Sequence, residues 1–177
     1  MRYFTKRLKN YQMKELKIAI GLGNPGDRYQ NTYHNVGLFA ISFFEEKGFF
    51  KNLKLFKSEA SAMNVSGGYV LKVMKKNKLS PEEILIIHDE SDIKIGEYKF
   101  SFDRNAAGHN GVQDIISRLN TKAFWRLRVG VQTNTNTHIK AQDFVLKNIP
   151  TSENKLIIQS LTAAAHSYEK KRGQRLT

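Results

Sequence analysis

Extended apolar segments alternate with segments of helical periodicity along this chain. Ile84-Leu-Ile-Ile87 is a continuous apolar run, which is typical of a strand buried on both faces. Residues 36–47 instead carry apolar side chains at helical spacing, and Gly48 is a natural helix end. Strands are expected at 16–22, 53–56, 84–87, 98–102 and 125–131, and helices at 36–47, 66–78, 110–119 and 152–171. This order predicts a single three-layer α/β domain with a mixed, mostly parallel sheet and helices on both faces.

The chain is strongly basic. Its 177 residues include 29 Lys and Arg against 16 Asp and Glu, which gives a net charge of +13. Such a charge indicates a polyanionic partner, with nucleic acid as the leading case. Much of the excess lies at the two ends of the sequence. We therefore interpret residues 1–12 as a basic N-terminal extension, disordered or not native, and residues 13–177 as the domain.

Composition and missing motifs exclude several classes of protein. The absence of Cys excludes a disulfide scaffold, a zinc–thiolate site and a cysteine nucleophile, and it fits a reducing cytoplasm. No apolar run approaches the ~18 residues that cross a bilayer, so no membrane association is expected. The sequence has neither a Gly-x-Ser-x-Gly elbow nor a Walker loop, the main signals of serine hydrolases and P-loop NTPases.

The segment Gly21-x-Gly23-x-x-Gly26 matches the dinucleotide-binding fingerprint letter for letter. In that fingerprint the helix begins inside the glycines, so that its N-terminus holds the pyrophosphate. Here Pro25-Gly26 signals a turn, and a polar loop separates it from the helix expected at 36–47. Nicotinamide or flavin binding is therefore not expected.

Polar residues gather at the ends of the expected elements: Asn24, His34, Asn64, Asp89 and His109-Asn110. The carboxyl ends of strands line the ligand crevice of an α/β sheet, so these segments could converge on one pocket. They supply histidine, a carboxylate and amides, but no nucleophilic Ser or Cys. Histidine can act as a general base on water, the carboxylate can orient it, and the amides can donate to a developing oxyanion. This set suits hydrolysis of an ester or amide by direct attack of water.

Six segments together resemble the bacterial peptidyl-tRNA hydrolase family. They are Gly21-Leu-Gly-Asn-Pro-Gly26, Tyr29-x-x-Thr32-x-His34-Asn35-x-Gly37, Met63-Asn64-x-Ser66-Gly67, His88-Asp89-Glu90-x-Asp92, Gly108-His109-Asn110-Gly111 and Arg126-Leu-Arg-Val-Gly130. They follow the family's order. The resemblance implies a cytoplasmic, monomeric enzyme that needs no metal or cofactor. Its substrate would be peptidyl-tRNA, bound by the acceptor stem and CCA end and cleaved at the ester joining the peptide to the 3′ ribose.

The resemblance also implies roles for three residues of the reaction centre. His34 is the general base, and Asp89 supports its basic form. Asn24 matches the amide that distinguishes blocked from free aminoacyl groups.

Five further positions are implied to contact the substrate. Tyr29, Asn64 and Asn110 match positions that line the peptidyl-adenosine end. His109 is adjacent and is expected near the acceptor end. Arg128 matches a basic position implicated in gripping tRNA phosphate, which suits the geometry of a guanidinium group.

The sequence departs from the family at several positions. Ala62 stands where an aromatic wall of the substrate groove is usual, and Ser101 replaces a phosphate-gripping Lys, for which Lys99 and Arg104 are the candidate substitutes. Tyr33 replaces a common Arg beside the histidine. These changes motivate an alternative, a divergent RNA-binding relative without turnover. A less favoured alternative is a metal-dependent phosphoesterase that uses His88, Asp89, Glu90 and Asp92, although consecutive strand residues point in alternating directions.

Overall fold

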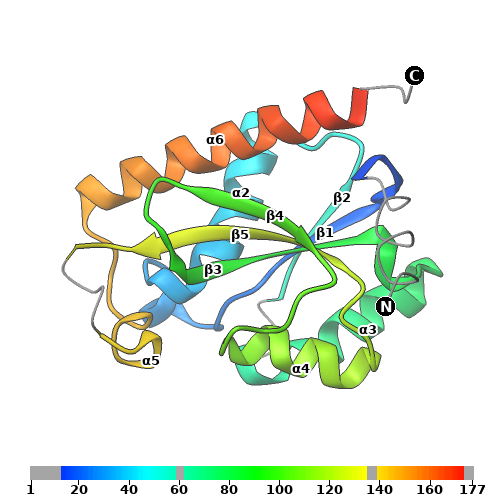
Figure 1. Ribbon diagram of the computed structural model, residues 1–177, viewed down its shortest axis with the longest axis horizontal. Coiled ribbons are helices and arrows are strands. Elements are labelled where there is room, and N and C mark those ends of the chain that lie inside the picture. The colour runs from blue at the N-terminus through cyan, green and yellow to red at the C-terminus, as the bar shows by residue number, and fades with distance from the viewer. Residues whose placement is uncertain (1–12, 59–61, 135–138, 174–177) are drawn as a thin grey trace, which may run out of the picture.

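A five-stranded sheet in the order β2-β1-β3-β5-β4 forms the middle layer of the structure (Figure 1). The computed structural model describes residues 13–58, 62–134 and 139–173, and the expected extension at 1–12 lies outside them. The strands are β1 (Ile18–Gly21), β2 (Lys54–Lys57), β3 (Ile84–Lys94), β4 (Tyr98–Phe102) and β5 (Trp125–Gln132). β1 is parallel to both β2 and β3, and β3 is parallel to β5, whereas β4 is antiparallel to β5. The predicted mixed, mostly parallel sheet is confirmed.

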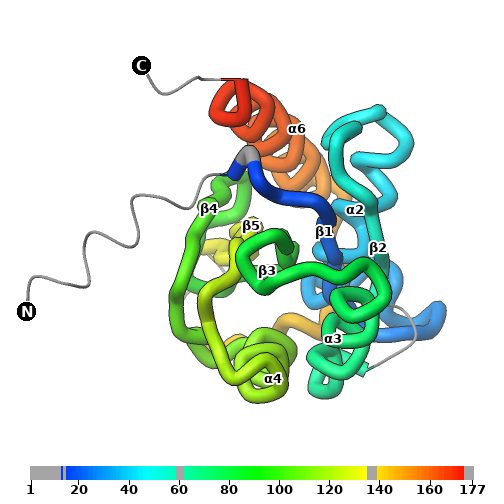
Figure 2. Tube along the Cα trace, turned by 90° about the vertical axis from the view of Figure 1, so that its right-hand side faces the viewer, coloured from blue at the N-terminus to red at the C-terminus, as the bar shows by residue number. Residues whose placement is uncertain are grey.

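Helices cover both faces of the sheet, as the end-on view in Figure 2 shows. α2 (Val36–Lys47) and α6 (Thr151–Gly173) lie on one face, and α3 (Ser66–Asn77) and α4 (Asn110–Leu119) lie on the other. A short helix, α5 (Ala141–Phe144), precedes α6. Short 3-10 turns complete the described elements: η1 (Met13–Glu15), η2 (Asp27–Tyr29), η3 (Tyr33–Asn35), η4 (Met63–Val65) and η5 (Pro81–Glu83). Among the described helices, none is long and apolar enough to span a membrane.

The alternation of side chains along β3 explains its continuous apolar run. Leu85 and Ile87 pack into the core cluster beneath α2 and α6, whereas Ile84 and Ile86 pack into the cluster beneath α3 and α4. Each side of the strand is therefore buried by a helical layer, and a polar residue on either side would have to be hydrogen-bonded. This requirement applies to the polar residues that follow Ile87.

β3 is longer than the sequence predicts. We expected a strand at 84–87 with Asp89 just after it, but the strand continues to Lys94. Its pairing with β5 continues through Asp89 opposite Val129 and Glu90 opposite Gly130, which holds these polar residues in regular strand geometry. Asp89 thus lies at the middle of the central strand, two residues beyond the end of its pairing with β1, where the ladder with β5 orients it.

Candidate active site

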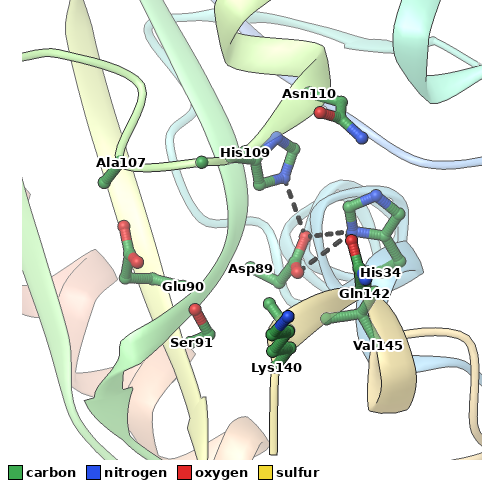
Figure 3. A pocket seen from close by; sticks show the side chains of 12 residues that line it. His34, Asp89, Glu90, Ser91, Ala107, His109, Asn110, Lys140, Gln142 and Val145 are labelled. Carbon is green, nitrogen blue, oxygen red and sulfur yellow. Dashed lines mark hydrogen bonds and ion pairs between the residues drawn. The ribbon is translucent and has the colours of Figure 1, made fainter.

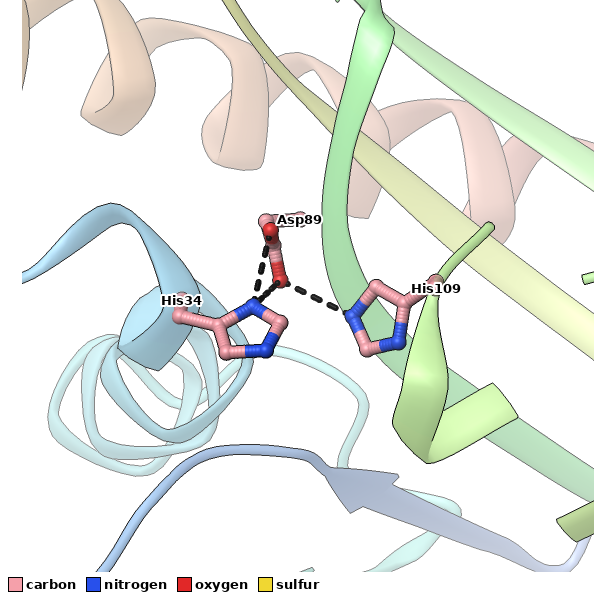
Figure 4. Close-up of side chains that lie close together, drawn as sticks. All are labelled: His34, Asp89 and His109. Atoms are coloured by element: carbon pink, nitrogen blue, oxygen red, sulfur yellow. Dashed lines mark hydrogen bonds and ion pairs between the residues drawn. The ribbon is translucent and has the colours of Figure 1, made fainter. Parts of the chain in front are cut away.

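His34 and Asp89 form a direct side-chain pair at the carboxyl edge of the sheet (Figure 4). His34 lies in η3, immediately before α2, and its Nδ1 is 2.9 Å from Asp89 Oδ1 and 3.0 Å from Oδ2. The Asp89 side chain is only 3% exposed, and that of His34 is 12% exposed. The carboxylate is therefore withdrawn from solvent, while the imidazole still reaches it.

A second imidazole ring, that of His109, shares the same carboxylate. His109 Nε2 is 3.0 Å from Asp89 Oδ1, and its Nδ1 accepts a hydrogen bond from the backbone N–H of Val112 at 3.3 Å. The histidine is thus the N-cap of α4, and the proton of the neutral ring belongs on Nε2, which donates to Asp89. An ionised carboxylate only accepts hydrogen bonds, so His34 likewise donates from Nδ1. The lone pair of neutral His34 is then on Nε2.

The pKa of Asp89 is lowered and that of His34 is raised, because in each case the partner outweighs the effect of burial. Burial favours the protonated carboxyl, but the charges and hydrogen bonds of His34 and His109 outweigh it and lower the pKa of Asp89 far below its usual range. Burial lowers the pKa of His34, but the charge and hydrogen bond of Asp89 outweigh it and raise that pKa above its ordinary value. Asp89 is therefore a carboxylate at neutral pH, as an orienting partner of a base must be.

The three side chains line one pocket of about 200 Å³ together with Asn110 and a wall from the α5 region. Figure 3 shows His109 and Asn110 on one side of Asp89, and Lys140 and Val145 on the other. Asn110 is the first residue of α4, so its placement follows from the helix start. Sequence reasoning missed the α5 wall, because a helix of four residues is too short to produce a periodic pattern.

Asn24 lies in the turn after β1 and is held by two neighbours. The buried Asn35 clamps its backbone: Asn24 N–H donates to Asn35 Oδ1 at 2.7 Å, and Asn35 Nδ2 donates to Asn24 O at 3.0 Å. The side-chain Oδ1 of Asn24 accepts from the backbone N–H of Met63 at 2.9 Å. The Nδ2 group of Asn24 is thus its remaining side-chain donor. Sequence reasoning quoted Asn35 but missed its function as the clamp.

Tyr29 and Asn64 are less closely tied to this pocket. Tyr29 lies in η2, and the guanidinium carbon of Arg28 is 4.5 Å from the centroid of its ring. Asn64 lies in η4 and is exposed. Neither residue lines the pocket around His34, and Asn24 does not either, since it lines a second pocket with Asn35. The η4 turn that carries Asn64 nevertheless packs closely against the start of α4. A methyl group added to Gly111 there would lie only 2.6 Å from the Met63 sulfur. Their expected substrate contacts remain predictions.

Arg128 lies in a separate basic groove. Its Nε donates to Glu90 Oε2 at 2.9 Å, and the Glu90 side chain is only 4% exposed. The groove is lined by residues of β4, the following loop, β5 and α6, including Lys99, Ser101, Arg104, Arg128 and Lys171. Lys99 and Arg104, the two positions considered as substitutes for the missing Lys, thus lie in the same groove as Arg128.

The four residues considered for a metal site do not come together. Buried His88 donates from Nδ1 to the Asp89 carbonyl at 2.6 Å, Glu90 pairs with Arg128, and Asp92 is exposed. Burial and repulsion by His109 and Arg126 keep the pKa of His88 well below its ordinary value. Within the described residues, only His34, Asp89 and His109 place potential ligand atoms within 4.8 Å of one another. Direct hydrogen bonds already join these atoms in pairs.

Comparisons with known proteins identify relatives over most of the chain. A family model described as peptidyl-tRNA hydrolase matches residues 42–175. The peptidyl-tRNA hydrolase of Mycoplasmopsis synoviae (strain 53) is 34% identical over 163 residues, which cover 85% of this chain and 86% of that protein. That of Mycoplasma capricolum is 34% identical over 162 residues, covering 82% and 87%. The crystal structure of peptidyl-tRNA hydrolase from Acinetobacter baumannii superposes with a TM-score of 0.74 at 26% identity, covering 91% of this chain and 90% of that one.

Proposed function

Since this chain belongs to the peptidyl-tRNA hydrolase family, we propose that His34 is the general base with which it hydrolyses the ester bond of N-blocked peptidyl-tRNA. The observation that carries this mechanism is the hydrogen bond from His34 Nδ1 to the buried Asp89. It leaves the lone pair of the ring on Nε2, and His34 lines the pocket. Asp89 orients the ring and stabilises the imidazolium once it forms.

The proposed reaction uses His34 as the base and two amides as donors. His34 Nε2 removes a proton from a water molecule as the water oxygen attacks the ester carbonyl. The amide Nδ2 groups of Asn24 and Asn110 are the donors we assign to the carbonyl oxygen as it becomes negative. The C–O bond to the ribose then breaks, and the 3′ oxygen takes the proton from His34. The products are a peptide with a free carboxyl group and a tRNA with a free 3′ hydroxyl.

The tRNA is bound through its acceptor stem and CCA end. We assign its phosphates to the basic groove of Arg128, where the guanidinium keeps donors beyond the Nε that pairs with Glu90. Lys99 and Arg104 supply charge there in place of the missing Lys. Tyr29, Asn64 and Asn110 are assigned to the substrate's peptidyl-adenosine end, and His109 is assigned to its acceptor end. We place the activity in the cytoplasm, where translation occurs, and expect the chain to act as a monomer without metal.

The proposal is tested with two tRNA substrates, one carrying an N-acylated amino acid and one carrying a free α-amino group. Wild-type protein should release tRNA from the blocked substrate only. His34→Ala should lower this activity by at least ~100-fold, because the base is lost, whereas His166→Ala, which changes an exposed histidine on α6, should not. Near-normal activity of His34→Ala would remove His34 as the base. Binding of tRNA by the wild type without cleavage would instead favour the RNA-binding relative.

A further inference from the structure

Tyr33, the residue before His34, joins the proposed base to the start of α6. Its side chain is buried, and its hydroxyl donates a hydrogen bond to Glu153 in the first turn of α6. Its ring packs edge-on against Phe144 of α5, with the centroids 5.8 Å apart and the planes at 80°. One side chain thus contacts the turn that carries His34, the helix that lines the pocket, and α6.

Backbone hydrogen bonds join the same two stretches of chain. The N–H of His34 donates to Val145 O at 2.8 Å, and that of Tyr33 donates to Lys147 O at 3.3 Å. On the other side of a bridge between Thr32 and Asn148, the N–H of Ile149 donates to Asn31 O at 2.8 Å. Residues 31–34 therefore lie along residues 145–149 in a short ladder, and the Tyr33–Glu153 bond extends the contact to α6.

The hydroxyl of Tyr33 has a strong reason to keep this partner. A buried hydroxyl without a hydrogen bond is costly, and a charged acceptor gives a stronger bond than a neutral one. Burial, with the hydrogen bond and charge of Glu153, raises the pKa of Tyr33, so the phenol keeps its proton and donates. A general base must lie within hydrogen-bonding reach of its water, and a misplacement of about 1 Å can cost ~100-fold in rate.

We propose that the hydrogen bond between Tyr33 and Glu153 is a positioning contact for the hydrolysis, which holds His34 and the α5 wall of the pocket in register with each other. This inference rests on the proposed function of His34. Tyr33 touches no reacting atom. It acts through the turn that carries the base, so its loss should lower kcat more than it raises KM.

The test compares Tyr33→Phe with variants of its partner. Tyr33→Phe keeps the ring on Phe144 and removes only the donor, and we expect kcat to fall about 10-fold with KM changed less than ~2-fold. Glu153→Ala should give the same loss, whereas Glu153→Gln, which keeps an acceptor oxygen, should recover most of the rate. The double variant Tyr33→Phe/Glu153→Ala should be no worse than either single variant, because one interaction cannot be lost twice.

Tyr168→Phe is the matched control. Tyr168 is also a buried tyrosine, and its hydroxyl accepts a hydrogen bond from Asn52 Nδ2 at 2.7 Å, but it lies on α6 and lines neither the pocket around His34 nor the basic groove. It should keep the wild-type kcat. A wild-type kcat in Tyr33→Phe, or additive losses in the double variant, would overturn the positioning function. Neither result depends on His34→Ala, whose retained activity would instead contradict the proposed base.

Discussion

At the scale of single residues, the buried carboxylate of Asp89 determines which nitrogen of His34 can act. Both of its oxygens lie within 3.0 Å of His34 Nδ1, and Oδ1 also accepts from His109. The two Asp89 oxygens on Nδ1 hold the His34 ring in place, and the hydrogen bond from His109 holds the carboxylate. With Nδ1 occupied (Figure 4), the proton that the proposed base takes from water would enter at Nε2.

We predict that Asp89→Asn moves the acid limb of kcat/KM to lower pH. Burial lowers the pKa of His34, but Asp89 outweighs it and raises that pKa above the ordinary value, and only the neutral ring can take a proton. Activity therefore rises with pH through this raised pKa. Without the carboxylate charge the pKa falls and the limb follows it, while the maximum drops by at least ~100-fold because the tautomer is no longer held. If the acid limb of Asp89→Asn stayed at the wild-type pH, Asp89 would not be the group that raises the pKa of the base.

Much of the site could be predicted from residue types at element ends, but the pairing of side chains could not. We expected His34 and Asp89 to meet because Asp89 would follow a strand end at the edge of the sheet. They do meet, but Asp89 lies inside β3, two residues beyond the end of its pairing with β1. The bond from His109 to Asp89 depends on the direction of an N-cap side chain, which sequence spacing does not give. Arg126 is almost fully buried, although a charged residue is expected at the surface.

At the scale of elements, the contact of α2 with the sheet depends on Gly37. A methyl group there would lie 2.4 Å from the carbonyl oxygens of Leu22 and Ile87. Gly37→Ala should therefore push α2, and with it His34, away from the strands. We expect a loss of about 2–3 kcal/mol in urea unfolding, together with a lower kcat.

A second helical glycine provides the control for that prediction. A methyl group on Gly68 of α3 would meet nothing closer than Arg118 at 3.8 Å. Gly68→Ala should be neutral or stabilising by up to ~1 kcal/mol, because alanine favours a helix. If Gly37→Ala and Gly68→Ala had the same free energy of unfolding, α2 would accommodate the methyl group on residue 37 without loss of stability.

The longer helices could be predicted because each has a clear hydrophobic period. The error in the length of β3 has a physical cause. The helix expected at 66–78 is observed as Ser66–Asn77, and the one expected at 152–171 as Thr151–Gly173. β3 was predicted too short because polar residues replace apolar ones after Ile87, while its ladder with β5 continues. Tertiary pairing, rather than local pattern, sets the end of that strand.

At the scale of the whole molecule, segments far apart in sequence build the basic groove. Arg128 comes from β5, Lys99 from β4 and Lys171 from the last turn of α6, where its Nζ lies 5.5 Å from the Phe100 ring centroid. Glu90 neutralises part of this charge and holds the Arg128 side chain. The groove therefore combines one oriented guanidinium with lysines, which suits a phosphate backbone more than a single small anion.

Binding of tRNA should consequently weaken as salt rises, and Lys171 should account for part of that dependence. Each neutralised phosphate releases counterions, so removing one contact lowers the slope of log Kd against log salt by about 0.7–0.9. We expect this decrease for Lys171→Ala, measured by fluorescence anisotropy with labelled tRNA over a salt series. Lys76→Ala, an exposed lysine in the last turn of α3 and outside the groove, should leave the slope unchanged. Equal slopes for both variants would place the phosphates elsewhere on this basic surface.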